Sequence, residues 1–220
     1  MSHNYLTKLK DKLTGKKESS ESSLTLEEEI PFALTSTILN YIIPSKEDAT
    51  ENDDIIKHSD QNNQECTVLI EEKINEGVWR FEGVFSNHEY ANFMIGIADE
   101  SCVFGANKLP QDDGNHEKIV AFWNTGEISH RFKHIEGNSE FKCGQKVAIE
   151  VNMEAKTCHF FVDGVQQPKY VVGIPPSIRF WVNISWEGSS FEVLRLQILP
   201  KSYGKTGKGF RAYEYGKEWK

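Results

Sequence analysis

Two carboxylates at alternating positions of one short run are the strongest catalytic candidate in this sequence. Glu150 and Glu154 flank Asn152 in the pattern E-x-N-x-E. Two carboxylates on one strand face can supply the nucleophile and the acid/base for cleavage of a glycosidic bond. The central residue is an amide, however, and no row of Trp and acidic residues accompanies it to line a sugar cleft. We therefore interpret Glu150 and Glu154 as solvated strand positions, and keep carbohydrate binding or cleavage as the alternative function.

Metal and cofactor chemistry is less well represented. His130, Phe132 and His134 would share one face of a strand, but two histidines supply only half of a tetrahedral zinc site. We expect a surface role for them, with no metal and no cofactor. The cysteines are widely spaced, which is typical of small buried hydrophobic residues in a reducing compartment. They are Cys66, Cys102, Cys143 and Cys158.

Charge is distributed unevenly along the 220 residues, whose formal net charge is −8. Residues 18–65 carry two Lys against twelve Asp or Glu, whereas residues 1–17 and 201–220 each have a net charge of +4. Because phosphate neutralisation dominates nucleic-acid binding, the acidic body argues against nucleic acid as the ligand. No apolar run is long enough to predict a membrane span or a signal peptide. We expect an intracellular, cytoplasmic protein, with at most weak membrane contact through its basic N-terminus.

The sequence divides into three segments. Residues 1–29 are basic and then rich in Ser and Glu, a composition typical of disorder. Residues 30–200 contain many short β-branched and aromatic runs separated by Gly, Asn or Pro, which predicts an antiparallel sandwich or barrel. Residues 201–220 are basic and aromatic, and two interpretations remain open for them, a flexible tail or a segment folded back onto the body.

The clearest strand pair lies in residues 144–168. Apolar residues alternate with more polar ones from Val147 to Met153, which is the period of a strand with one buried and one wetter face. The second run, Cys158–Val162, leads to Asp163-Gly164, a dipeptide that favours a turn. Two such strands are not stable alone, so this pair must belong to a larger packed sheet.

Five motifs in sequence order resemble those of SPRY domains. Gly77–Glu82 resembles the family's G-x-W-x-x-E strand, and Met94–Ala98 is similar to its x-x-G-V-A strand. Gly144–Val147 stands where the family has G-D-x-V/I, and Val151–Gly164 resembles its V-D-x … x-T-I-x-F-x-x-N-G hairpin. Ile174–Val182 resembles the closing P-x-x-x-P-x-V-x-L strand.

Three positions depart from these motifs. Gln145 replaces the frequent Asp, Asn152 stands where Asp is common, and Asp163 stands where Asn is common. The last two exchanges keep the turn chemistry, because Asn and Asp both tolerate turn conformations. They leave the fold expectation standing, but they preserve no particular ligand site.

The resemblance implies a bent antiparallel β-sandwich of the concanavalin-like kind with short flexible or partly helical termini. It also implies a non-enzymatic protein that recognises a peptide or loop of a partner through loops at one rim. We expect the loops at 105–117 and 186–190 and the turn at 124–126 to form that rim, whose acidic residues favour a basic partner. Trp186 would either anchor the partner or cap the sandwich. The candidate contact residues are Asn107, Lys108, Asp112, Asp113, Asn115, His116, Asn124, Trp186 and Glu187.

Overall fold

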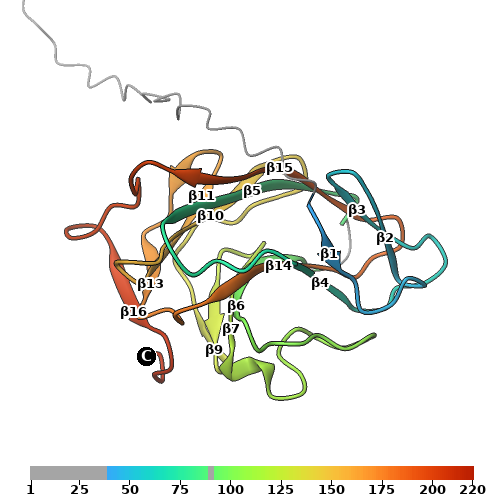
Figure 1. The fold of residues 1–220 in the computed structure, drawn as a ribbon, viewed down its shortest axis with the longest axis horizontal. Helices are drawn as coiled ribbons and strands as arrows, with labels where there is room; N and C mark the ends of the chain where they lie inside the picture. Colours follow the sequence, from blue (N-terminus) through green and yellow to red (C-terminus); the bar gives the residue numbers. More distant parts are fainter. Residues whose placement is uncertain (1–38, 89–91) are drawn as a thin grey trace, which may run out of the picture. The chain divides into compact units, whose positions relative to one another are not determined.

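The computed structural model describes residues 39–88 and 92–220, and these residues form two stacked β-sheets (Figure 1). The segment predicted for residues 1–29 lies outside the described residues. The only helix among the described residues is the short 3₁₀ turn η1 (Asn115–Glu117). The predicted all-β sandwich is therefore confirmed.

The first sheet, which we call sheet A, has seven strands. Its order is β1 (Tyr41–Ile42), β4 (Cys66–Ile70), β14 (Ile178–Ile184), β6 (Met94–Asp99), β7 (Ile119–Trp123), β8 (Ile128–His130) and β9 (Lys133–Ile135). All of its neighbouring strands are antiparallel. The strand that was expected to carry His130, Phe132 and His134 on one face is divided into β8 and β9 by a tight turn at Arg131 and Phe132.

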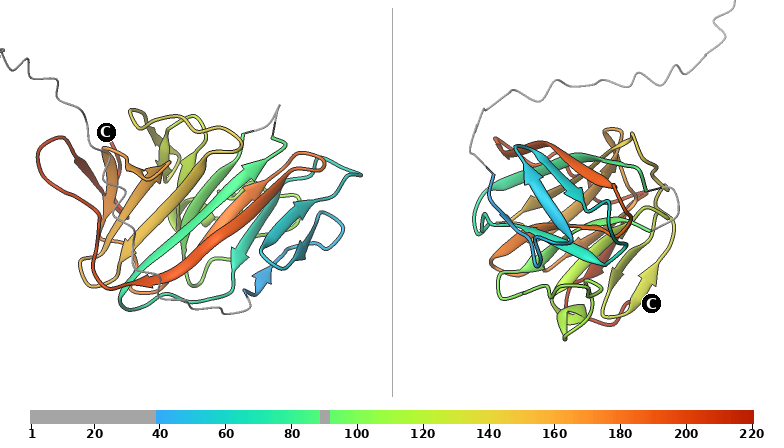
Figure 2. Two further views of the ribbon diagram at one scale, coloured as in Figure 1. Left: turned by 90° about the horizontal axis from the view of Figure 1, so that it is seen from above. Right: turned by 90° about the vertical axis from the view of Figure 1, so that its right-hand side faces the viewer.

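The second sheet, sheet B, has nine strands. Its order is β16 (Arg211–Glu214), β13 (Lys169–Val172), β11 (Thr157–Val162), β10 (Lys146–Asn152), β5 (Val78–Ser86), β15 (Ser190–Leu199), β3 (Ile55–His58) and β2 (Ala49–Asn52), and the two-residue β12 (Val165–Gln166) pairs with β11. One pair of strands, β13 and β16, is parallel, whereas the other pairs in sheet B are antiparallel. Figure 2 shows this sheet from above in its left-hand view.

The predicted hairpin of residues 144–168 is present as β10 and β11. Its register pairs Val147 with Val162 and Asn152 with Thr157. The Asn152 Oδ1 atom accepts hydrogen bonds from the backbone N–H groups of Glu154 and Ala155, at 3.1 and 2.9 Å, which fixes the turn. The expectation of one wet face is wrong for most of β10, because its residues from Val147 to Val151 are buried on both sides of the sheet.

The core between the sheets is largely aromatic. Phe81 of β5 stacks on Phe180 of β14 with ring centroids 5.1 Å apart, and it also packs against Phe191 of β15 at 5.7 Å. Phe81, which belongs to the Gly77–Glu82 motif, thus buries its large side chain against the opposite sheet. Burial of each such side chain stabilises the fold by about 2–3 kcal/mol relative to exposure.

Glycine is required at one position of sheet A. A Cβ atom on Gly96 would collide with the Trp181 ring and with the Val120 carbonyl oxygen. Gly96 therefore lets the Trp181 indole lie flat against β6, on the outer face of sheet A. This explains why the third position of the Met94–Ala98 motif is a glycine.

The C-terminal residues fold back onto the body, so the structure selects one of the two interpretations left open for residues 201–220. β16 extends sheet B, and Trp219 is buried in the main core cluster. The Trp219 indole donates a hydrogen bond to the Glu214 carbonyl oxygen at 2.8 Å. Aromatic residues of this segment therefore serve as packing residues.

All four cysteines are free thiols. Cys66, Cys102 and Cys158 are buried, as predicted, whereas Cys143 is exposed and that part of the prediction is wrong. Among the described residues, no helix is long and apolar enough to cross a membrane.

Candidate functional site

A long loop, residues 100–118, is held against the outer face of sheet A. It leaves β6 and returns to β7 at the end of the sheet where β14 begins. Phe104 packs edge-on against Trp181 with ring centroids 5.6 Å apart, and the Asn115 side-chain amide donates a hydrogen bond to the Val103 carbonyl oxygen at 2.8 Å. The loop is therefore a fixed surface, and buried Asn115 holds its shape and does not point outward.

The remaining predicted residues of this loop lie on its exposed side. Lys108 and Asp113 form an ion pair at 3.7 Å, and Asn107 and Asp113 both have positive φ angles. The Asp112 carboxylate accepts a hydrogen bond from the Leu109 N–H at 3.0 Å. Of these residues, Asn107, Lys108 and Asp113 are exposed and Asp112 is half-buried.

The predicted loop after β14 lies at the opposite end of that strand. The Glu187 N–H donates to Asn63 Oδ1 at 2.8 Å, and the Gly188 N–H donates to the Ser59 carbonyl oxygen at 3.2 Å. Trp186 is half-buried and Glu187 is exposed. These contacts tie the Trp186–Ser190 loop to the segment that follows β3.

The end of β14 that leads to Trp186 carries a polar cluster. The Asn183 amide donates hydrogen bonds to the Glu65 carboxylate at 3.2 Å and to the Thr67 hydroxyl at 3.0 Å. Burial raises the pKa of Glu65, whereas the hydrogen bond from Asn183 lowers it. This cluster lies at the end of β14 opposite the end where the loop of residues 100–118 is anchored.

Asn124 has a structural role. Its side-chain oxygen accepts a hydrogen bond from the Phe93 N–H at 3.3 Å, and its own N–H donates to the Phe93 carbonyl oxygen at 3.0 Å. The following Gly126 closes the turn with a hydrogen bond to the Trp123 carbonyl oxygen at 2.9 Å. This turn fixes the β7–β8 connection and offers few free polar groups.

His116 belongs to a shallow hollow between η1 and strands β7 to β9. Its ring stacks on that of Phe132, with centroids 4.1 Å apart. Phe132 is 63% exposed and has a φ angle of 63°, directly after Arg131 with a φ of 50°. Two large residues in left-handed conformations are uncommon, so the β8–β9 turn is a strained one that displays an aromatic ring.

His130, Phe132 and His134 do not share a strand face, and the expectation that they do is wrong. His130 is buried, with Nδ1 2.7 Å from the Ile119 carbonyl oxygen, while its Nε2 accepts the Gly216 N–H at 2.9 Å. Since Nδ1 must donate and Nε2 must accept, neither nitrogen can bind a metal. His134 faces Glu127 instead, at 3.7 Å. Among the described residues, no group of three metal-binding side chains occurs.

Glu150 is not solvated, which corrects the prediction for this carboxylate. It is 0% exposed, and its Oε1 atom accepts hydrogen bonds from the Ser202 hydroxyl and from the N–H groups of Tyr203 and Gly204, at 2.7–2.9 Å. Glu154 is exposed in the β10–β11 turn, as predicted. The two carboxylates therefore do not flank a common cleft, and Glu150 instead fastens the C-terminal segment to β10.

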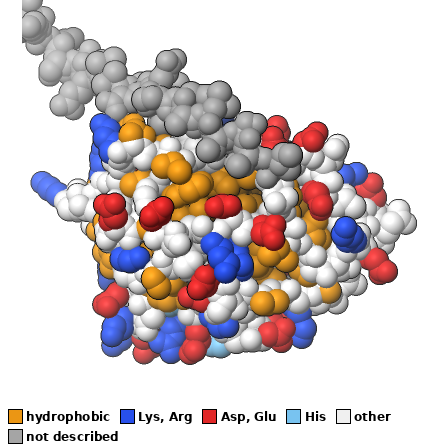
Figure 3. Space-filling model, viewed as in Figure 1, with side chains coloured by type: hydrophobic (Ala, Val, Ile, Leu, Met, Phe, Trp, Pro, Cys, Tyr) orange, Lys and Arg blue, Asp and Glu red, His pale blue; other side chains and the backbone are white. Residues whose placement is uncertain are grey.

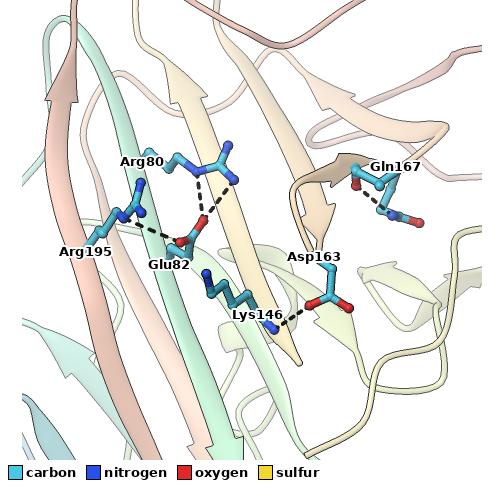
Figure 4. A network of polar contacts seen from close by, with 7 residues as sticks. Arg80, Glu82, Lys146, Asp163, Gln167 and Arg195 are labelled. Carbon is cyan, nitrogen blue, oxygen red and sulfur yellow. Dashed lines mark hydrogen bonds and ion pairs between the residues drawn. The ribbon is translucent and has the colours of Figure 1, made fainter. Parts of the chain in front are cut away.

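A charged network on the outer face of sheet B was missed by the sequence reasoning (Figure 4). Glu82 accepts two hydrogen bonds from the Arg80 guanidinium, at 3.0 and 3.2 Å, and lies 3.6 Å from Arg195. The Arg80 guanidinium also covers the Phe161 ring at 4.3 Å. Arg80 and Glu82 occupy alternate positions of β5, so the sequence alone could have indicated that they form an ion pair on one face of the strand. Their partner Arg195 could not be predicted in this way, because it lies in a strand more than a hundred residues later.

Comparison with known proteins now adds to these observations. No family model matches the sequence, and no curated protein matches it. Solved structures do match. The SPRY domain of human HERC1 is similar with a TM-score of 0.50 and 17% identity, over 68% of this chain and 95% of that domain. The TRIM65 PSpry domain gives 0.54 and 10%, over 72% and 90%, and a human SPRY domain gives 0.52 and 11%, over 70% and 96%.

These similarities define the class of structure. The chain is a two-sheet, antiparallel-rich β-sandwich. More particularly, its fold is that of SPRY domains, as the five sequence motifs indicated. At identities of 10–17% the likeness concerns the fold and carries no residue of a binding site with it.

Proposed function

We propose that this chain is a non-enzymatic protein-interaction module that binds a peptide or loop of a partner protein. The observation that carries the proposal is the fold that the chain shares with the SPRY domains of HERC1 and TRIM65. Two loops of this fold, residues 100–118 and Trp186–Ser190, display candidate contact residues that are at least partly exposed, among them Asp112, Trp186 and Glu187.

The candidate loops favour a basic partner. Asp112 of the loop of residues 100–118 and Glu187 of the Trp186–Ser190 loop are acidic and at least partly exposed, and Lys108 is paired with Asp113. Attraction between exposed charges is screened by salt, so binding weakens as ionic strength rises. Trp186 is half-buried, which suits an aromatic group that both closes the sandwich and offers one edge to a partner.

The carbohydrate alternative is less well supported. Its two carboxylates are separated in the fold, and Glu150 is fully buried beneath residues 202–204. A sugar could reach Glu150 only if the C-terminal segment left β10. The proposal also keeps the expected intracellular, cytoplasmic location, which the free thiols support.

The proposal is tested with proteins cross-linked to the full chain in cells. Each captured protein is purified and its affinity is measured against the unmodified chain and two variants, Asp112→Asn with Glu187→Gln, and Trp186→Ala. We expect a loss of about two- to tenfold from the charge variant and more from the tryptophan variant. Glu154→Gln, at an exposed turn, is the matched control and should bind normally. If every specific partner binds all variants equally, the loop surface is wrongly assigned.

A further inference from the structure

Sheet B is open, with β16 as the edge strand at one end and β2 as the edge strand at the other. β2 pairs only with β3, and no other described strand lies on its outer side. The right-hand view of Figure 2 faces this open edge, with β2 and β3 in blue and cyan. A strand at an uncovered edge presents backbone donors and acceptors that can pair with another chain.

The register shows which groups are free. In β3, the His58 N–H donates to the Ser189 carbonyl oxygen and the Ser59 N–H donates to the Asp48 carbonyl oxygen, both at 2.8 Å. The backbone N–H and C=O groups of successive β3 residues therefore point alternately to β15 and to β2. In β2, the residues whose backbone groups form hydrogen bonds with β3 are Thr50 and Asn52. It follows that Glu51 turns both its N–H and its C=O away from the sheet.

The side chains around this edge are predominantly acidic. Residues 46–60 carry six Asp or Glu against two Lys, and the ion pair formed among them is Lys57 with Asp60, at 2.9 Å. Figure 3 shows acidic side chains, interspersed with basic ones, at the right-hand end of the molecule, where β2 and β3 lie. The exposed carboxylates of Glu47, Glu51, Asp53 and Asp54 have no ion-pair partner among the described residues.

The electrostatic effect of these carboxylates extends to sheet A. Burial raises the pKa of the Tyr41 hydroxyl in β1, and the Asp54 and Glu51 carboxylates raise it further. β1 is the corresponding edge strand of sheet A. The carboxylates around β2 therefore also act on a residue of β1, and a cation placed beside β2 would relieve their mutual repulsion.

We propose that the β2 edge docks an extended segment of a partner protein that is rich in Lys or Arg, which pairs with Glu51 and continues sheet B by one strand. Backbone hydrogen bonds supply affinity in such strand addition, and alternate side chains supply specificity. Here the unpaired carboxylates select basic side chains, and the exposed Ile55 offers an apolar contact. The inference rests on the proposed interaction role, but it uses a different surface from the loop of residues 100–118.

A protective role is the competing explanation. Short edge strands with charged side chains also prevent sheets from pairing with one another. The two explanations differ in their response to a basic strand, because a purely protective edge rejects any added strand, whereas a docking edge accepts one of complementary charge.

The test uses the full chain and three short fluorescent peptides. One alternates Lys with Thr, the second has Glu in place of Lys, and the third is the Lys peptide with alternate backbone nitrogens methylated. Fluorescence anisotropy measures binding, and NMR hydrogen exchange follows the Glu51 amide. We expect that only the Lys peptide binds, and that the Glu51 amide exchanges more slowly in its complex. No binding of the Lys peptide, or equal binding of its methylated form, would overturn the proposal.

Variants separate this site from the loop surface. Glu51→Gln with Asp54→Asn should weaken the Lys peptide about three- to tenfold, since exposed charge pairs contribute about 0.2–1 kcal/mol each. Glu154→Gln is the matched charge control and Asp112→Asn reports on the loop surface, and both should leave peptide binding unchanged. Weakening by Asp112→Asn but not by the edge variants would place the peptide on the loops, which would contradict this inference while supporting the proposed function.

Discussion

The two edges of sheet B are built differently. At one edge, β16 pairs in parallel with β13. Residues that precede and follow β16 in the sequence form hydrogen bonds with buried side chains of other strands. Glu150 accepts three hydrogen bonds from residues 202–204, and His130 accepts one from Gly216. At the other edge, β2 has four residues, of which three are exposed, and it touches only β3 within the sheet.

Both edge strands of sheet B expose backbone groups on their outer side, but they are held in different ways. The residues around β16 are fixed by buried polar contacts and by Trp219. β2 is surrounded by exposed carboxylates instead. We therefore expect the stability of the β16 edge to depend on buried interactions, and binding at the β2 edge to depend on charge.

The largest expected effect is at the β16 edge. Glu150→Ala leaves one hydroxyl and two N–H groups without their acceptor, so we expect the free energy of unfolding to fall by about 3 kcal/mol. Urea denaturation measures the loss, and hydrogen exchange should be faster in residues 211–214. Glu154→Ala on the exposed turn is the control, expected to change stability by less than about 0.5 kcal/mol. Equal stabilities for the two variants would show that Glu150 does not hold the segment.

Acidification should act on the same edge through its histidines. Burial lowers the pKa of His159 from 6.5 to about 4, and it also lowers the pKa of His130. A lowered histidine pKa gives stability that is present above pH 6.5 and is lost as the pH falls toward the folded value. We expect His159 alone to contribute a loss of about 1 kcal/mol by about pH 5.5.

Urea denaturation at a series of pH values measures this loss. His159→Gln should flatten the pH dependence, whereas His134→Gln, at an exposed residue, should leave it unchanged. His88, whose pKa burial also lowers to about 4, adds a similar loss away from the C-terminal segment, so the pH dependence should be reduced by the variant but not abolished. A pH dependence identical in both variants would contradict the assignment to His159.

The smallest effect concerns the backbone of the open edge. Glu51→Pro removes an N–H that faces away from the sheet, whereas Thr50→Pro removes one that bonds to β3. Proline is tolerated at edge positions of the first kind. We expect Thr50→Pro to cost about 1 kcal/mol more than Glu51→Pro, as measured by thermal or urea unfolding. The reverse order would mean that the register leaves Thr50, and not Glu51, facing outward.

Much of the fold could be predicted from local patterns. The hairpin expected in residues 144–168 is present as β10 and β11, and the Gly77–Glu82 motif lies at the start of β5, whose Phe81 is in the core. The residues of the candidate surface were less predictable. Asn115 and Asn124 have turn-forming chemistry, but whether their side chains point outward depends on contacts with Val103 and Phe93 that the local sequence does not specify.

The sequence by itself determined the class of the fold, because short apolar runs and the turn residues between them can be recognised locally. It also determined the acidic character of residues 46–60. The tertiary structure alone decided the role of Glu150, because its alternation with apolar residues predicts a wet strand face and only a covering segment buries it. That segment begins 52 residues later, at Ser202. Likewise, only the strand order shows that β16 and β2 are the two edge strands of sheet B.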